Sequence, residues 1–420
     1  METILNTLRV FKFGGSSVAD VDRIKGVARL VTTAVEDGPI IVVTSAVAGV
    51  TDRLLDLARG LDAGEAEQTH ETMLALCNDH RRLAAQLSDD RVTHEIEAIL
   101  TRFQACVTGH QHGRALFDLV LSFGERLAAP LVAAALRDAG VQGLSFDCTD
   151  FLLTTAEHGD AWTLGRETDE AIHNTLTPFI EVGNTPVVTG YCGVSSAGNV
   201  TTLGRGGSDS TATIIGGAMR AHSVTLWSDV AGVMTADPRV VAKARVVPHL
   251  SYREAAELSY HGAKVLHPRA MIPVVDKKIP VWCKSTFEPE LPGTLIDESR
   301  VVGSEPVKAC SVATGYRLMT VEGKGMAGMP GVGAAVLLAL ANADINVVMI
   351  SQACSEVSIS LGVSAGDAPA AKAALDDACA DTWLGNAVES VNLRDGQIAM
   401  IAAVGCGMVE SPGVAARFCA

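Results

Sequence analysis

A glycine-rich segment stands near the middle of the sequence and reads Thr201-Thr202-Leu203-Gly204-Arg205-Gly206-Gly207-Ser208-Asp209. It lies between an apolar run typical of a strand, residues 186–191, and a run typical of a helix, residues 211–221. Glycines let the backbone approach a ligand closely, and Ser208 and Asp209 are expected to cap the helix and leave its first N–H groups facing an anion. Arg205 adds a planar guanidinium that can bind a carboxylate or phosphate through two hydrogen bonds. The alternative for an isolated turn of this kind is a plain loop with a solvated arginine.

Composition restricts the class of protein. The chain has 420 residues, enough for two or three domains, and 48% of them are hydrophobic although only 4% are aromatic. Aliphatic side chains must therefore fill the cores, as in parallel α/β sheets whose strands are buried on both faces. With 48 Asp and Glu against 33 Lys and Arg, the net charge of -15 argues against a nucleic-acid or anionic membrane partner.

Motifs for targeting, metal binding and disulfides are not evident. No run approaches the roughly 20 apolar residues of a membrane span, and the N-terminus does not read as a signal peptide, so we expect a cytoplasmic protein. The ten cysteines form no C-x-x-C pair, and we interpret those in strand-like runs as reduced core residues, namely Cys192, Cys283, Cys310 and Cys354. Neither H-E-x-x-H nor a Walker-type phosphate loop occurs, and no resident metal is predicted.

The first strand-like run, residues 8–15, ends in a pair of glycines. Ser16 and Ser17 then favour a helix start, with the helix over residues 18–35. Lys12 would lie at the carboxyl end of a buried strand, the place where open α/β sheets bind their ligands. Because an unpaired lysine is costly to bury, we interpret Lys12 as a residue that binds an anion rather than as a structural one.

The same layout recurs along the chain. Residues 39–44 predict a second strand, followed at 45–51 by small and hydroxyl residues before a helix. Repeated strand, turn and helix predict a doubly wound sheet, so the fold class is α/β. Residues 60–115 read as a helical excursion without chemistry, and residues 121–127 open a long helix. Glu125 falls in the first turns of that helix, where an acid also favours the helix dipole, so a structural role stays open for it.

Residues 224–264 supply further polar groups. A strand from residue 224 leads into a turn-rich segment, 227–239, with two acids and an arginine suited to a ribose, a base edge and a phosphate. Lys264 is a second candidate phosphate cation. Prolines at 289–292 and the polar stretch 297–305 predict an interdomain boundary.

The C-terminal part contains an internal repeat. Gly323-Lys324-Gly325-Met326 with Pro330-Gly331-Val332 recurs as Gly405-Cys406-Gly407-Met408 with Pro412-Gly413-Val414, so a strand, a glycine turn and a helix are used twice. The second copy stops inside its helix, which predicts either a cut chain or completion from elsewhere. Glycines at 323, 325 and 328 also fit a dinucleotide fingerprint, but the nearest acid, Asp344, precedes its strand, which disfavours that alternative.

Four motifs in order resemble one family, the aspartate kinases of the amino-acid-kinase superfamily. They are Lys12-Phe13-Gly14-Gly15-Ser16-Ser17-Val18-Ala19, Thr202-Leu203-Gly204-Arg205-Gly206-Gly207-Ser208-Asp209, Trp227-Ser228-Asp229-Val230 and Gly262-Ala263-Lys264-Val265-Leu266-His267-Pro268. The repeated tail is similar to the family's paired ACT regulatory units. The resemblance implies a three-layer α/β sandwich with a mainly parallel sheet over residues 1–300. An ACT-type α+β unit would follow over 301–390, and a truncated second unit would start over 391–420.

The resemblance also implies an activity and its residues. An aspartate kinase uses ATP and Mg²⁺ to phosphorylate the β-carboxylate of L-aspartate, the first step of lysine, threonine and methionine biosynthesis. Lys12 and Asp209 would be catalytic, with Asp209 at the reaction centre. The amino acid would be held by Ser45, Thr51, Glu125, Arg205 and Ser208. The nucleotide would be held by Lys12, Gly14, Gly15, Gly206, Gly207, Ser228, Asp229, Arg239 and Lys264.

Feedback control by an end-product amino acid is a further implication. Residues 346–356 are more similar to threonine-responsive than to lysine-responsive relatives, and Gln352 can both donate to and accept from a hydroxyl. The alternative is that Gln352 only ends a strand. The implied effector residues are Met329, Asp344, Asn346 and Gln352, and pairing of ACT units implies a homo-oligomer. Two other classes stay open: a kinase of the same fold acting on another small acid or amino acid, and a catalytically silent amino-acid sensor, which would lose Lys12 or Arg205.

Overall fold

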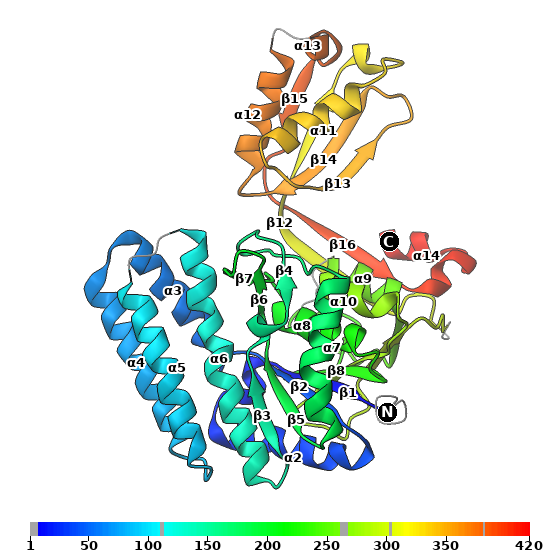
Figure 1. Ribbon diagram of the computed structural model, residues 1–420. Coiled ribbons are helices and arrows are strands. Elements are labelled where there is room, and N and C mark those ends of the chain that lie inside the picture. The colour runs from blue at the N-terminus through cyan, green and yellow to red at the C-terminus, as the bar shows by residue number, and fades with distance from the viewer. Residues whose placement is uncertain (1–6, 110–112, 261–267, 302–304, 381–382) are drawn as a thin grey trace. The chain divides into compact units, whose positions relative to one another are not determined.

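The computed structural model describes residues 7–109, 113–260, 268–301, 305–380 and 383–420 (Figure 1). The chain divides into two units, one made of residues 1–309 together with 404–420 and the other of residues 310–403. Each unit has its own sheet and its own hydrophobic core.

The first unit is built on an eight-stranded sheet in the order β3-β5-β2-β1-β8-β10-β11-β9. Neighbouring strands run parallel except β10 and β11, which are antiparallel. The strands are β1 (Arg9–Phe13), β2 (Ile40–Thr44), β3 (Gly143–Phe146), β5 (Thr185–Thr189), β8 (Ser223–Ser228), β9 (His249–Ser251), β10 (Val281–Ser285) and β11 (Thr294–Asp297). The mainly parallel α/β sheet expected from the sequence is confirmed. Strand β11 lies between the two stretches from which we expected the interdomain boundary, and the first unit continues to residue 309.

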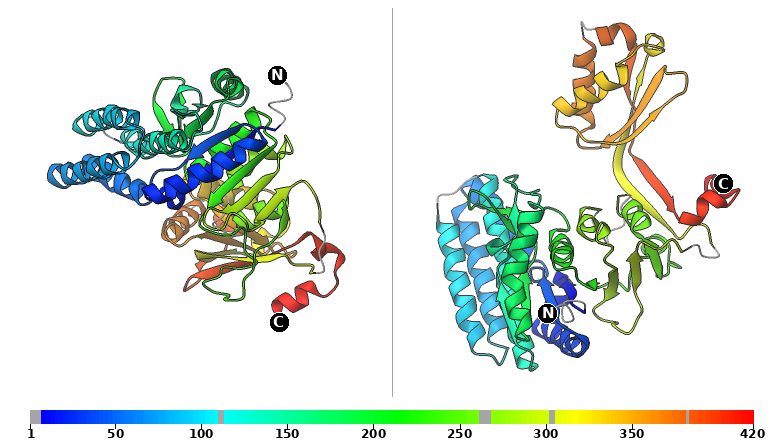
Figure 2. Two further views of the ribbon diagram at one scale, coloured as in Figure 1. Left: turned by 90° about the horizontal axis from the view of Figure 1, so that it is seen from below. Right: turned by 45° about the vertical axis from the view of Figure 1, so that its right-hand side comes forward.

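Helices cover both faces of this sheet. Phe11, Phe13 and Val42 alternate in sequence with residues of the opposite face and pack against α2 (Val21–Ala34) and α6 (Arg114–Asp138) in one core. On the other face, α8 (Gly207–Ala218) approaches β1 and β8 so closely that a Cβ at Gly216 would lie 2.5 Å from Val224 Cγ2. The remaining α-helices described between residues 7 and 309 are α3 (Val50–Ala63), α4 (Ala66–Ala84), α5 (Arg91–Thr108), α7 (Arg166–Glu181), α9 (Tyr252–Tyr260) and α10 (Pro268–Val275). Helices α4 and α5 form the expected helical excursion beside α6 (Figure 2).

Helix α6 differs from the expectation that no run could span a membrane. Its 25 residues have a window of mean hydropathy 1.6, which by length and composition alone would suffice. In the structure 89% of that window is buried against the sheet and the neighbouring helices, as in the core helix of a globular unit.

Three element starts differ from the sequence predictions. Gly206, with φ 74°, is the N-cap of α8, so Ser208 and Asp209 lie in the first turn and do not cap it. Helix α2 begins after Asp20, whose carboxylate accepts the N–H of Arg23 at 2.9 Å, whereas the predicted caps at 16–17 lie in a 3-10 turn, η1 (Gly15–Val18). Helix α6 begins at Arg114, so Glu125 lies in its middle and not near its N-terminal dipole.

A hairpin separates β5 from the glycine-rich segment, an insertion that the sequence did not indicate. It consists of β6 (Cys192–Ser195) and β7 (Val200–Thr202), and it joins β4 (Leu153–Thr154) in a small three-stranded sheet. Tyr191, which enters the hairpin, adopts φ 75°, a left-handed conformation that is uncommon for a bulky residue. The hairpin therefore presents the Arg205 turn immediately after β7.

The second unit is an antiparallel α+β fold with strand order β13-β14-β12-β15, and β16 also pairs with β12. Its core is aliphatic and includes Met319, Val336 and Leu361. The elements are β12 (Ala309–Glu322), α11 (Val332–Asn342), β13 (Val347–Gln352), β14 (Ser358–Ser364), α12 (Ala368–Cys379), α13 (Trp383–Ala387), β15 (Ser390–Leu393) and β16 (Ile398–Val404). Strands β15 and β16 both pair with β12, and the bounds of the two ACT units that the resemblance implies stay predictions.

The internal repeat is confirmed in the structure. Gly323 and Gly405 both introduce 3-10 turns, η4 (Lys324–Met326) and η5 (Cys406–Glu410), and helices α11 and α14 (Val414–Cys419) follow. A Cβ at Gly323 would lie 2.1 Å from the carbonyl oxygen of Ala387, and one at Gly405 would lie 2.2 Å from that of Pro306. Each copy of the turn thus packs on its own segment of backbone in the same way.

The cysteine interpretation holds in part. All ten cysteines are free, and Cys192 and Cys283 are buried in the core. Cys310 is half-buried, whereas Cys354 is exposed in the turn after β13, so its placement in the core was wrong. An apolar run beside a turn does not by itself show which of its side chains is exposed to solvent.

Candidate active site

The first feature of the site is an ion pair between Lys12 and Asp209, with Nζ 2.7 Å from Oδ1. Lys12 lies at the carboxyl end of β1, and Asp209 lies in the first turn of α8. Both side chains are mostly buried, at 13% and 18% exposure. Asp209 therefore offsets the cost of burying the ammonium group and fixes it beside the N-terminus of a helix, where an anion is favoured.

Glu125 is the second feature, and it reaches the same edge from the middle of α6. It is 3% exposed; Oε1 accepts the N–H of Ala46 at 3.1 Å, whereas Oε2 has no hydrogen-bond partner among the described residues. Burial raises the pKa of this carboxyl to about 8, although the Ala46 amide, Lys12 and Ser208 lower it in part. A buried carboxyl with one unsatisfied oxygen is suited to bind a cationic group.

Close backbone contacts hold the carboxyl ends of β1 and β2 together at the site. The N–H of Ser45 donates to the carbonyl of Phe13 at 3.0 Å, which holds the end of β2 beside the end of β1. A Cβ at Gly15 would lie 2.8 Å from the carbonyl oxygen of Ala46, and one at Gly14 would lie 3.6 Å from Lys12 Nζ. The predicted glycine pair thus lies against both the lysine and the segment that follows β2.

Arg205 lies in the turn between Gly204, with φ 73°, and Gly206. It is exposed, and among the described residues it forms no ion pair. Ser208 is buried at the start of α8, where it packs so tightly that a Cβ on Gly190 would lie 2.6 Å from its own Cβ. The turn therefore carries an exposed guanidinium immediately before the N-terminus of α8.

The remaining predicted substrate residues lie on the same edge. Half-buried Ser45 follows β2 directly, and exposed Thr51 lies in the first turn of α3. Neither side chain forms a hydrogen bond within the part of the chain that the structure describes, so both roles stay predictions.

The predicted nucleotide residues are only partly brought together. Ser228 ends β8, next to β1 in the sheet, and Asp229 follows it as an exposed residue. Arg239 is 70% exposed and pairs with Asp237 at 2.6 Å, a local contact within its own loop. Lys264 lies outside the described residues. The nucleotide assignments therefore stay predictions.

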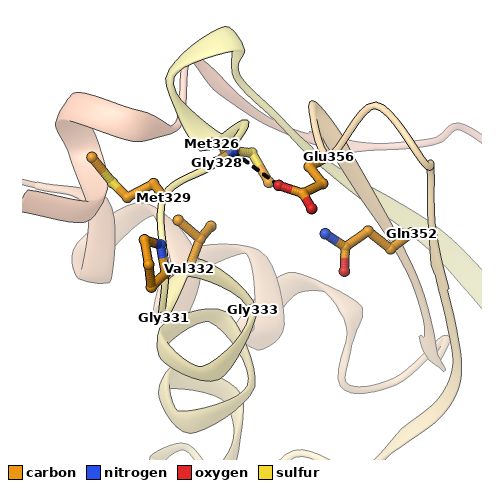
Figure 3. Close-up of a pocket in the computed structure, with 9 residues that line it drawn as sticks. Met326, Gly328, Met329, Gly331, Val332, Gly333, Gln352 and Glu356 are labelled. Carbon is orange, nitrogen blue, oxygen red and sulfur yellow. Dashed lines mark hydrogen bonds between the residues drawn. The ribbon is translucent and has the colours of Figure 1, made fainter.

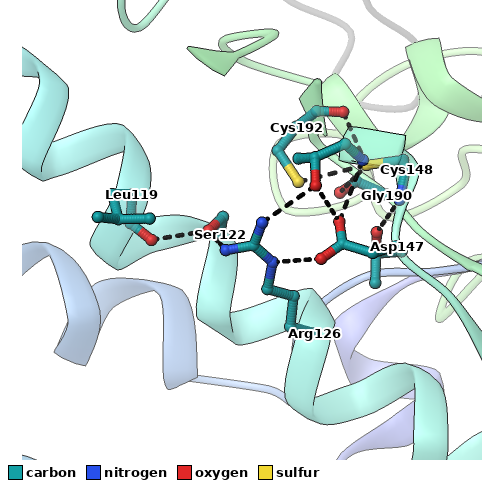
Figure 4. Close-up of polar contacts among 9 residues, drawn as sticks. Leu119, Ser122, Arg126, Asp147, Cys148, Gly190 and Cys192 are labelled. Atoms are coloured by element: carbon teal, nitrogen blue, oxygen red, sulfur yellow. Dashed lines mark hydrogen bonds and ion pairs between the residues drawn. The ribbon is translucent and has the colours of Figure 1, made fainter. Parts of the chain in front are cut away.

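A second polar cluster on α6 has a structural role (Figure 4). Arg126 donates through Nε to Asp147 at 2.6 Å, and it also contacts Ser122 at 2.8 Å and the Thr149 hydroxyl at 3.1 Å. The carboxylate of Asp147 also accepts the N–H and hydroxyl of Thr149, so both of its oxygens are engaged. These contacts fix α6 to the segment after β3.

Two thiols lie beside this cluster, with Cys148 Sγ 3.3 Å from Cys192 Sγ. Together with Asp147 they form a set of three groups close enough to hold a metal ion. The Cys148 hydrogen bond and burial keep the pKa of Cys192 well above its usual value, so the thiol stays protonated. Since Asp147 is also committed to Arg126, we assign no metal here.

The second unit contains a cavity of about 350 Å³ between the turn that precedes α11 and the end of β13 (Figure 3). Glu356 points into this region, and its Oε2 accepts the N–H of Gly328 at 2.9 Å. The lining residues are Met326, Gly328, Met329, Pro330, Gly331, Val332, Gly333, Gln352 and Glu356. Of the four implied effector residues, Met329 and Gln352 line the cavity, whereas Asp344 and Asn346 are exposed and do not.

Comparison with known proteins agrees with this architecture. The model of the amino acid kinase family matches residues 7–285, and that of an ACT domain matches residues 319–379. The chain belongs to the amino acid kinase family. Within that family its relatives are aspartokinases.

The structure of Escherichia coli aspartokinase III in complex with aspartate and ADP has 31% identity and a TM-score of 0.83, covering 97% of this chain and 90% of that one. Aspartokinase 2 of Arabidopsis thaliana is 35% identical over 84% of this chain and 65% of its own length. Bifunctional aspartokinase/homoserine dehydrogenase 1 of the same plant is 32% identical over 97% of this chain. The chain spans about half the length of the bifunctional relatives it matches, 46% in that case.

Proposed function

We propose that the chain is an aspartate kinase that transfers the γ-phosphoryl group of ATP to the β-carboxylate of L-aspartate, giving ADP and 4-phospho-L-aspartate. One observation carries the proposal. Two groups of opposite charge, Glu125 and Lys12, come from separate elements to the carboxyl ends of β1 and β2, and Glu125 keeps an oxygen there without a partner among the described residues. The complex of the E. coli relative with aspartate and ADP supports the same substrates.

The substrate is bound as a zwitterion with a free side chain. Glu125 holds the ammonium group, and Arg205 holds the α-carboxylate through two parallel hydrogen bonds, because a guanidinium matches a carboxylate in shape. Ser45, Thr51 and Ser208 supply neutral hydrogen-bonding groups around it. With its ammonium group and α-carboxylate held, the amino acid is left with its β-carboxylate facing the nucleotide.

The chemistry needs charge neutralisation rather than a general base. A β-carboxylate has a pKa of about 3.9, so it is already ionised at neutral pH and can attack the γ-phosphorus directly. A new O–P bond forms, the bond to the β,γ-bridging oxygen breaks, and ADP leaves. ATP enters as its Mg²⁺ complex, and Lys12, the amide at Gly15 and the N-terminus of α8 stabilise the phosphoryl oxygens. The Gly14 N–H donates instead to the carbonyl of Trp227 at 3.1 Å, so Gly14 contributes close backbone approach. Asp209 orients Lys12 for this role.

The nucleotide is assigned to the next part of the same edge. Gly206 and Gly207 bring backbone to the phosphates, Ser228 and Asp229 follow β8, and Arg239 and Lys264 supply further cations. Arg239 must leave Asp237 to do so, which makes it the weakest of these assignments.

A product assay separates this proposal from a sibling kinase with another acceptor. Purified protein with Mg·ATP and hydroxylamine should form aspartyl hydroxamate, and ADP release should require aspartate rather than glutamate or N-acetylglutamate. Lys12→Ala serves as the inactive control, with its fold checked by circular dichroism. Release of ADP with N-acetylglutamate but not aspartate would establish the sibling kinase, and no ADP release with any acceptor would establish the silent sensor.

We also propose feedback control through the ACT units of a homo-oligomer. A second structure of the E. coli relative is a complex with lysine and aspartate in the T state, with 31% identity and a TM-score of 0.75. Here Gln352 and Met329 line the cavity of the second unit, and an amide can pair with a hydroxyl as donor and acceptor. Threonine is therefore the proposed effector. The cytoplasmic location stays a prediction.

A further inference from the structure

Asp118 is a buried acid on α6 that the reaction itself does not use. It is 2% exposed, and three groups point at its carboxylate. The hydroxyl of Thr202 donates to Oδ1 at 2.6 Å, whereas the N–H of Gly159 at 3.0 Å and Nδ1 of His158 at 2.8 Å bind Oδ2. The Thr202 hydroxyl and the Gly159 N–H both donate, so each carboxyl oxygen of Asp118 accepts a hydrogen bond.

These contacts tie two loops to one point of the helix. Thr202 ends β7, three residues before Arg205, and its carbonyl accepts the N–H of Ala161 at 2.9 Å. The loop around residue 160 also lies directly under the glycine next to Arg205, because a Cβ at Gly204 would be 2.8 Å from Asp160 Oδ1. That aspartate is held in turn by an ion pair with Arg269, whose guanidinium stacks 4.0 Å above the Trp162 ring. The base of the Arg205 turn is thus fixed on both sides.

Asp118 and Glu125 share one face of α6. They are seven residues apart, which is two helical turns and about 10.5 Å along the axis. Glu125 binds the ammonium group of the proposed substrate directly, and Asp118 fixes the segment that carries Arg205, which binds the α-carboxylate. One buried helix therefore positions both residues that hold the amino acid.

We propose that Asp118 is a positioning residue that holds the Arg205 turn at a fixed separation from Glu125, and through it sets the affinity of the site for the ammonium group and α-carboxylate of the amino acid. The inference rests on the proposed aspartate kinase function. Loss of the Asp118 contact frees the turn and weakens aspartate binding. ATP binding does not depend on this contact.

Two neighbouring threonines provide a matched test. Thr202 and Thr201 are consecutive residues of β7, are 1% and 0% exposed, and point to opposite faces of the strand. Thr202 bonds Asp118, whereas the Thr201 hydroxyl bonds that of Thr154 at 2.6 Å. Thr202→Val and Thr201→Val therefore remove the same group from the same strand, and only the first releases Asp118.

The expected result is a difference in KM rather than in stability alone. Thr202→Val should raise the aspartate KM about tenfold and leave the ATP KM within twofold. Thr201→Val should lower Tm without changing either KM. Thr202→Ser should restore wild-type values because it keeps the hydroxyl, and His158→Ala, on the partly exposed side, should shift the aspartate KM in the same direction as Thr202→Val.

The outcomes separate this inference from the function on which it rests. Equal aspartate KM values for Thr202→Val and Thr201→Val, with an active wild type, would overturn the positioning role alone. If Thr202→Val does not fold, an unchanged aspartate KM in His158→Ala would overturn it. A wild type without aspartate-dependent ADP release would overturn the proposed function as well.

Discussion

The pKa of Glu125 predicts that aspartate binding releases a proton. The free carboxyl has a pKa of about 8 because it is buried, whereas its ordinary value is 4.5. At pH 7 only about one tenth of the free protein carries the ionised form that binds an ammonium group, and at pH 6 about one hundredth. Because the apparent affinity scales with the fraction of the competent form, the aspartate Kd should fall about tenfold between pH 6 and 7 and level off above pH 8.

Calorimetry measures this effect directly. Titrations with aspartate at pH 7 in two buffers of different ionisation enthalpy should show release of about 0.9 proton per aspartate bound. Glu125→Gln should bind aspartate weakly, with no proton release and with a flat pH dependence from pH 6 to 8. Titration of the substrate itself is common to both proteins, so the difference between them reports Glu125.

The same pKa sets the sign of a stability effect. Between pH 4.5 and 8 the folded state holds a proton on Glu125 that the unfolded chain has lost, so the stability of the unliganded protein falls as pH rises through this window. Glu125→Gln should remove that loss and raise Tm at pH 8. A wild type with the same aspartate Kd at pH 6 and pH 8 and no proton release would refute the reasoning.

Variants at three other residues test the separate roles assigned to them in catalysis, substrate binding and regulation. Lys12→Ala should lower kcat about a hundredfold or more in the ADP-release assay, because its charge is needed most as the phosphoryl oxygens rearrange; an undiminished kcat would remove Lys12 from catalysis. Arg205→Lys should raise the aspartate KM because a point charge cannot reproduce the two parallel hydrogen bonds, and an unchanged KM would end the carboxylate assignment. Threonine should raise Tm and lower activity, and Gln352→Ala should reduce both effects; inhibition by lysine alone would contradict this assignment.

Much of the fold could be predicted because it depends on local patterns. Buried aliphatic strands such as Ile40–Thr44 read as strands of a parallel sheet, and glycines follow the strand ends where backbones meet. The helix starts were less predictable. Gly206 caps α8 with a left-handed φ and no side-chain hydrogen bond, a solution that composition does not distinguish from capping by Ser208 or Asp209.

The site could be predicted as a set of residues but not as a set of contacts. Lys12 and Asp209 were singled out separately, yet nothing local indicates that residues so far apart form an ion pair. Asp118 was missed, although one signal was present: it is an acid in a mostly apolar helix, seven residues before Glu125 and so on the same face. The hairpin that connects it to Arg205 depends on long-range pairing, which sequence periodicity does not show.

The hydrogen bonds around helix α6 distinguish the buried ionisable side chain that binds a ligand from the two that are structural. Asp118, Glu125 and Arg126 are all 9% exposed or less, and each would be costly to bury without partners. Asp118 has three hydrogen-bond partners and Arg126 has Asp147, Ser122 and Thr149, so both are satisfied within the protein. Only Glu125 keeps an oxygen without a partner, and burial holds its pKa near 8 for that reason. Removing the charge of Asp118 leaves hydrogen-bond donors unpaired, and removing that of Arg126 leaves a carboxylate unpaired, so both changes should lower stability. Glu125→Gln should raise stability, because the missing partner of Glu125 is the substrate ammonium.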